Sequence, residues 1–135
     1  MKSRKSLIRL KRFQVDEKRR QVSDIESMIA DFQKMSGELD MQIKAEQERS
    51  GIDDVTHFAY PTFAKAAMQR RDNLLTSVEE LNIQLATAQG ELGGAFEELK
   101  KIELMEEKEG ERVRAEEMAK DQASMDEIGL RVQPV

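Results

Sequence analysis

The apolar residues of this chain recur at alternating spacings of three and four along one long stretch. We call this stretch the second ladder, because another lies upstream, and its positions are Leu74, Val78, Leu81, Leu85, Ala88, Leu92, Ala95, Leu99 and Ile102. This alternation places them along one narrow side of an α-helix, the side that coiled-coil helices bury against each other. The spacing therefore predicts a long helix that packs against another helix.

A first apolar ladder lies upstream and has the same character. Its members lie seven or fourteen residues apart, or three residues after such a position: Ile8, Val15, Val22, Ile25, Ile29, Phe32, Leu39 and Ile43. One break, between Ser50 and Pro61, separates the two ladders. The pattern predicts an all-α fold of two long helices that form an antiparallel coiled-coil hairpin with a frayed C-terminal tail. Such a hairpin has little interior in which to place a catalytic pocket.

Glycine and proline fix the expected boundaries. Gly51 can adopt the left-handed conformation that ends helices, and Pro61 suits the first turn of a helix. We expect helix one over about residues 3–49, a link over 50–60 and helix two from about residue 61. The hairpin should cover residues 1–116, and residues 117–135 should form a weakly ordered helical extension and tail because no helix-one residues remain to pair with them.

Two registers satisfy both ladders. Pairing Ile29 with Leu81 and Ile43 with Ala67 keeps the paired residue numbers at a sum of 110, and a slip of one heptad gives sums of 117. Lys11 and Lys18 interrupt the first ladder, and we expect their stems to lie along it while the ammonium groups reach water.

Four further positions depart from the ladder pattern. Arg71 interrupts the second ladder and is expected to pair with one of three acids, Glu38, Asp40 or Glu46. Gly90, Gly93 and Gly94 are weak helix formers, and they mark either a tolerated soft spot or a functional bend.

The charge is abundant and unevenly placed. Charged residues form 36% of the chain and aromatic residues 4%, which is typical of coiled coils rather than of compact globules. The net charge of -5 combines nine bases and two acids in residues 1–20 with ten acids and four bases in residues 103–127. An antiparallel hairpin brings these segments together, so the charges either neutralise one another or serve a partner surface.

Residue types exclude most catalytic chemistry. The chain has no cysteine and one histidine, so the usual zinc ligand sets cannot form. His57 is expected to be a capping or packing residue at the turn. We predict a non-enzymatic protein with no catalytic residues, cofactor or metal site. No apolar stretch is long enough to span a membrane, no secretory signal is recognisable, and a cytoplasmic location is expected.

Two surfaces are candidates for partner contacts. The first is the basic end, the start of helix one, where two apolar residues are surrounded by cations. We predict that it binds a ring-shaped partner through Arg4, Lys5, Arg9, Leu10, Arg12 and Phe13. At the turn end, Phe58, Phe63 and Met68 lie off the ladders. They form either an exposed contact patch or a cover over the open end of the hairpin.

Three segments suggest a family. The opening MKSRKSLIRLKRFQV, the following DEKRR and the stretch FAYPTFAKAAMQRRDNLL at residues 58–75 resemble FliJ-type flagellar export proteins, in particular alphaproteobacterial members. The resemblance implies a coiled-coil component of the flagellar type III export apparatus, which serves flagellum biogenesis and motility. It implies a stalk-like coupler that contacts the hexameric export ATPase, the membrane export gate and export chaperones, at the flagellar base on the cytoplasmic face of the inner membrane.

Two other functions remain open from the residues alone. A generic coiled-coil scaffold or spacer would have the same ladders. A basic-helix nucleic-acid-binding protein would have a similar N-terminus, although its basic stretch would not be interrupted by Leu7, Ile8, Leu10 and Phe13.

Overall fold

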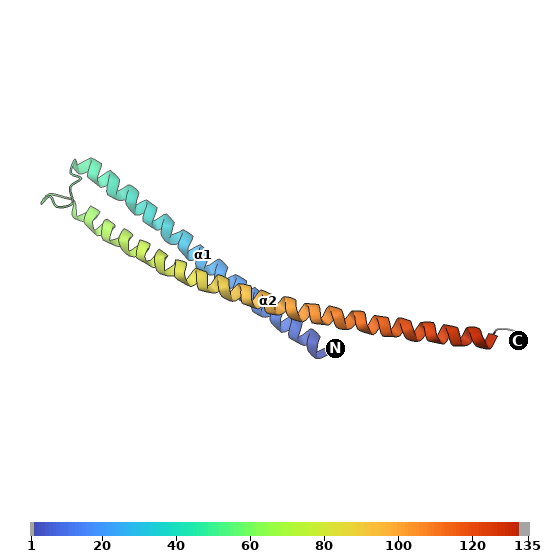
Figure 1. Ribbon diagram of the computed structural model, residues 1–135. Helices are drawn as coiled ribbons and strands as arrows, with labels where there is room; N and C mark the ends of the chain where they lie inside the picture. The colour runs from blue at the N-terminus through green and yellow to red at the C-terminus, as the bar shows by residue number, and fades with distance from the viewer. Residues whose placement is uncertain (1, 133–135) are drawn as a thin grey trace. The chain divides into compact units, whose positions relative to one another are not determined.

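Two helices make up the fold. The computed structural model describes residues 2–132, with α1 over Lys2–Ser50 and α2 over Thr62–Val132 (Figure 1). The described residues contain no strand. The all-α helical hairpin predicted from the ladders is confirmed, and each helix boundary at the turn lies within a residue or so of its expected position.

The helices contribute to two compact units. The turn unit, Asp16–Gly93, holds the second part of α1, the link and the first part of α2. The terminal unit combines the described parts of Met1–Val15 and Gly94–Val135. Within each unit the two helical segments run antiparallel. This division differs in kind from the domain limit expected at residue 116, which stays a prediction.

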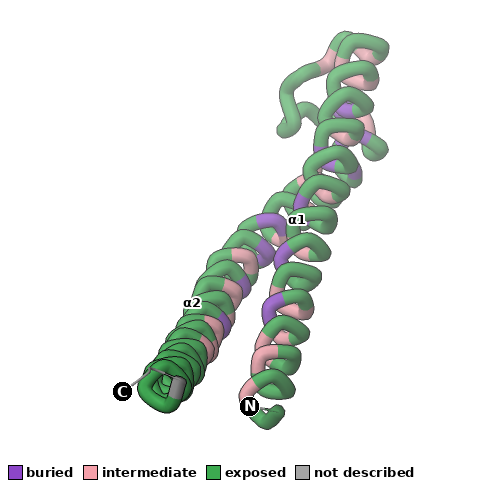
Figure 2. The backbone as a smooth tube through the Cα atoms, turned by 90° about the vertical axis from the view of Figure 1, so that its right-hand side faces the viewer, coloured by how far each residue is buried: buried purple, intermediate pink, exposed green. Residues whose placement is uncertain are grey.

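Burial follows the ladders. All nine positions of the second ladder and all eight of the first are buried or half-buried, separated by exposed residues (Figure 2). In the turn unit Ile29, Val78 and Leu81 form a buried cluster. Ile25, Phe32 and Leu85 pack against this cluster. Burying a side chain of this kind contributes about 1.5–3 kcal/mol, so these contacts hold the two helices together.

Ion pairs between the two helices show which residues lie opposite each other, and so identify the register. In the turn unit the Lys18 Nζ lies 2.8 Å from the Glu91 carboxylate, and the Arg71 guanidinium lies 2.9 Å from Asp40. The residue numbers of these pairs add up to 109 and 111, which selects the predicted register of 110 in this unit. Asp40 is one of the three acids expected for Arg71. Hydrogen bonds from this guanidinium, first to Asp40 and then to Asp72, raise the pKa of Arg71.

The end of α1 is closed by glycine, as expected. Gly51 has φ of 74°, and its N–H donates to the carbonyl of Gln47 at 2.9 Å. This geometry satisfies one of the carbonyls that every helix C-terminus leaves free. The Ser50 hydroxyl adds a bond by accepting from the Ile52 N–H at 3.2 Å.

The link after Gly51 is a series of tight turns that lead into α2. Asp54 Oδ1 accepts from the Thr56 hydroxyl at 2.7 Å and from the Thr56 N–H at 3.0 Å, and these bonds lower the pKa of Asp54. His57 caps the next turn, because its Nδ1 accepts from the Ala59 N–H at 3.0 Å. The carbonyl of Pro61 then accepts the first bond of α2, from Lys65 at 3.2 Å.

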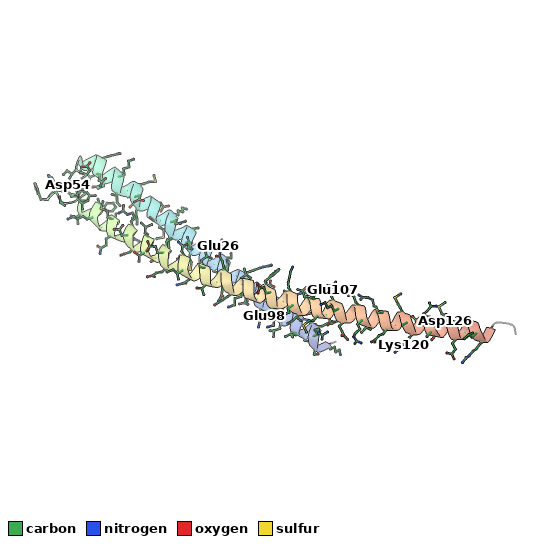
Figure 3. The ribbon with its side chains drawn as sticks, viewed as in Figure 1. Glu26, Asp54, Glu98, Glu107, Lys120 and Asp126 are labelled. Carbon is green, nitrogen blue, oxygen red and sulfur yellow. The ribbon has the colours of Figure 1, made fainter. Side chains whose placement is uncertain are left out.

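The last part of α2 continues past the start of α1 within the terminal unit (Figure 1). Residues 111–131 are all exposed, including Lys120 and Asp126, which Figure 3 labels. The predicted helical extension is present to Val132. Its weak ordering stays a prediction, and residues 133–135 lie outside the described residues.

Candidate partner-binding surfaces

The hollows along the described parts of the helices are open grooves. One groove in the turn unit has a volume of about 440 Å³, and Ile25, Ile83 and Thr87 are among its lining residues. Of its two carboxylates, Glu91 is engaged by Lys18. Across residues 2–132 no three side chains of the metal-binding types gather into a group that could hold an ion.

The basic end is partly neutralised by α2. In the terminal unit Arg4 lies 3.5 Å from Glu106 and Lys11 lies 2.9 Å from Glu98. The residue numbers of these pairs add up to 110 and 109, so this unit has the same register. Arg12 is also engaged, since its guanidinium reaches diagonally to Glu103 at 3.7 Å. The charges of the two segments therefore neutralise one another in part.

Two of the predicted ring-binding cations face solvent. Lys5 and Arg9 are exposed, and together with Ile8 and Arg12 they line one hollow of about 270 Å³. Leu10 is 50% exposed and Phe13 is 61% exposed. The structure thus brings Lys5, Arg9 and Arg12 together on α1 and leaves Leu10 and Phe13 outside the helix interface. Arg4, which is half-buried against Glu106, is the least accessible member of the predicted set.

The three apolar residues predicted at the turn end have different surroundings. Phe58 is 97% exposed and stacks on the His57 ring, with centroids 4.8 Å apart. Phe63 is 55% exposed at the start of α2. Met68 is half-buried, and its sulfur lies 3.9 Å from the Tyr60 hydroxyl. Phe58 therefore covers nothing at the open end of the hairpin, whereas Met68 is part of the packing there.

Tyr60 closes the turn end, and sequence reasoning did not identify this role. Its side chain is 5% exposed, and its hydroxyl accepts a hydrogen bond from Gln47 Nε2 at 2.9 Å. Ala64 and Ala67 are buried on the first turns of α2. The alternation of Tyr60, Ala64 and Ala67 at spacings of four and three is the signal that could have shown it.

The fold and its surfaces define the class of protein. Two helices pack through heptad ladders and carry charged outer faces, which is the organisation of an antiparallel coiled coil. None of the described helices has an apolar stretch long enough to cross a membrane.

Comparison with known proteins then gives the family. The family described as Flagellar FliJ protein matches residues 4–132. The chain therefore belongs to the FliJ family, and it is a coiled-coil protein related to flagellar protein export, as the resemblance of its three segments implied. No curated protein and no solved structure matched the chain.

Proposed function

We propose that this chain is a non-enzymatic, stalk-like coupler between the hexameric flagellar export ATPase and the membrane export gate, and that it also engages export chaperones. The family match over residues 4–132 carries the proposal. The paired helices support it, because they offer long surfaces and no described metal-binding group. We place the protein in the cytoplasm, peripherally at the inner membrane at the flagellar base.

The basic end is the proposed contact with the ATPase ring. Lys5 and Arg9 supply exposed positive charge, and Leu10 and Phe13 supply exposed apolar surface on the same segment of α1. Charge of this kind speeds the encounter with an acidic ring, and apolar contacts then slow dissociation. Arg4 and Arg12 contribute less, since each is already near a glutamate of α2.

A charge-reversal experiment tests the ring contact. Lys5→Glu with Arg9→Glu should weaken stimulation of the purified export ATPase, and added salt should weaken the wild-type association in the same direction. The matched control is Lys34→Glu with Lys44→Glu, which reverses two exposed lysines of α1 in the turn unit. Equal stimulation by wild type, test variant and control would refute this role for the basic end.

The turn end is the proposed second contact, centred on Phe58 and Phe63. Phe58 is almost fully exposed, and an aromatic side chain in that position is a good anchor for a partner pocket. Phe58→Ala with Phe63→Ala should reduce motility and export with little change in melting temperature. Met41→Ala with Ile83→Ala is the control, since both residues are exposed apolar positions elsewhere in the turn unit. A large fall in melting temperature would instead assign the two phenylalanines to the packing of the turn.

A nucleic-acid-binding function is less well supported. Three cations of the basic end are engaged by Glu98, Glu103 and Glu106 of α2, and these carboxylates would repel a phosphate backbone.

A further inference from the structure

The outer side of the first turns of α1 carries exposed apolar side chains next to positively charged ones. In the terminal unit Leu7 is 40% exposed, Leu10 is 50% exposed and Phe13 is 61% exposed. Their spacing of three residues places them along one arc of the helix surface. Residues 2–15 contain six cations and no carboxylate. This segment is therefore a basic amphipathic helix whose apolar arc remains 40–61% exposed beside the packing against α2.

The cations nearest this arc remain available. Arg9 precedes Phe13 by four residues, so the two side chains are neighbours on the helix surface. Lys5 lies one turn before Arg9 and lines the same hollow. Among the residues that the structure describes, no carboxylate lies within ion-pair distance of Lys5 or Arg9, in contrast to Arg4, Lys11 and Arg12.

We infer that this N-terminal face, formed by Lys5, Leu7, Arg9, Leu10 and Phe13, binds the surface of an anionic lipid bilayer. A basic amphipathic helix lies in the plane of such a surface, with its apolar side chains among the acyl chains and its cations at the headgroups. Charge complementarity selects anionic over neutral lipid, because each cation near the surface contributes about a fivefold gain in affinity. The exposed leucines and phenylalanine favour a bilayer over a nucleic acid, because apolar side chains are stabilised among acyl chains and not against phosphates.

This inference deepens the proposed peripheral placement at the inner membrane by naming the surface that contacts the lipid, and it does not depend on the proposed coupling to the ATPase ring. The bilayer would use the same face of α1 that the ring is proposed to contact, so the two states would exclude each other. A chain on the bilayer would be held near a membrane-embedded partner until the ring captured its basic end.

Vesicle flotation with the purified full chain tests the inference without the ATPase. One set of vesicles contains equal amounts of phosphatidylglycerol and phosphatidylcholine, and the other contains phosphatidylcholine alone. The charge variant is Lys5→Glu with Arg9→Glu, and its control is Lys34→Glu with Lys44→Glu. The apolar variant is Leu10→Ser with Phe13→Ser, and its control is Met41→Ser with Ile83→Ser. Circular dichroism verifies that each variant stays helical, as expected for changes at exposed positions.

We expect wild type to float with the anionic vesicles and not with the neutral ones. The charge variant should lose at least about thirtyfold in partition coefficient, because two cations are removed and two repelled anions are added, and the apolar variant should lose about tenfold, while both controls stay within about twofold of wild type. Absence of anionic-vesicle binding by wild type would overturn the inference. Retention by the apolar variant would also overturn it, since attraction to any polyanion, including duplex DNA, would then explain the binding. If wild type binds the anionic vesicles and the charge variant does not, but the charge variant still stimulates the ATPase normally, only the proposed ring contact would be refuted.

Discussion

Three glycines in the middle of α2 allow a prediction whose size follows from the structure. Gly90, Gly93 and Gly94 are exposed and lie inside a continuous helix. A Cβ atom built at any of the three meets nothing within 4 Å. Neither packing nor backbone conformation therefore requires glycine here, and the triple change to alanine should stabilise the fold. Alanine is favoured over glycine in a helix interior by about 0.8–1.0 kcal/mol per residue, so we expect a gain of about 2–3 kcal/mol.

Such a gain is large for a domain whose total stability is typically about 5–15 kcal/mol. Urea denaturation followed by the circular dichroism of the helices would show this gain as a higher midpoint with an unchanged slope. Two single variants calibrate the assay. Gly37→Ala is also free of contacts and should gain about 1 kcal/mol. Gly51→Ala should lose about 1–2 kcal/mol, because its φ of 74° is strained for any residue with a Cβ.

The triple variant also decides between the two explanations of these glycines. Normal motility of the stabilised variant would make the glycines a tolerated soft spot. Impaired motility with higher stability would make them a bend that function needs. A triple variant that is no more stable than wild type, while Gly37→Ala gains as expected, would refute the reasoning, because α2 would then not be an ordinary exposed helix around residues 90–94.

The remaining predictions concern packing and register in the turn unit. Leu81→Asp should unfold the hairpin by circular dichroism, because a charge without a partner inside the buried cluster costs several kcal/mol; a variant that stays helical would contradict the cluster. Lys18→Glu should destabilise by about 1 kcal/mol, and adding Glu91→Lys should restore the melting midpoint, whereas a lack of rescue would argue against the observed register. Tyr60→Ala should cost about 3 kcal/mol in urea denaturation, whereas Phe58→Ala should stay within about 0.5 kcal/mol of wild type; equal losses would contradict the different burial of the two rings.

The ladders were sufficient to predict the helices, because burial in a two-helix pair has the same period as the apolar residues. The link was also predictable in outline, since Gly51 and Pro61 act locally through their own backbone preferences. Neither prediction needed knowledge of contacts between distant residues.

Two buried residues escaped the pattern for a physical reason. Ser36 is 5% exposed and occupies the position between Ile29 and Ile43 at which the first ladder lacks an apolar residue. Its small side chain fits the helix interface, but its polarity hides it from a search for apolar spacing. Tyr60 lies in the link before α2, so its burial depends on the path of the link, and only its spacing of four and three to Ala64 and Ala67 indicates it from the sequence.

The candidate site was less predictable than the fold because its chemistry depends on pairing. Counting residues shows a positive segment at the start of the chain, but the register decides which cations meet a carboxylate. In the observed register Arg4 and Arg12 lie against glutamates of α2, whereas Lys5 and Arg9 point to solvent beside an exposed apolar arc. Charge that is already paired contributes little to a new contact, since a partner must first compete with the existing carboxylate. The surface available to a ring or a bilayer is therefore narrower than the sequence indicates, and it is centred on Arg9.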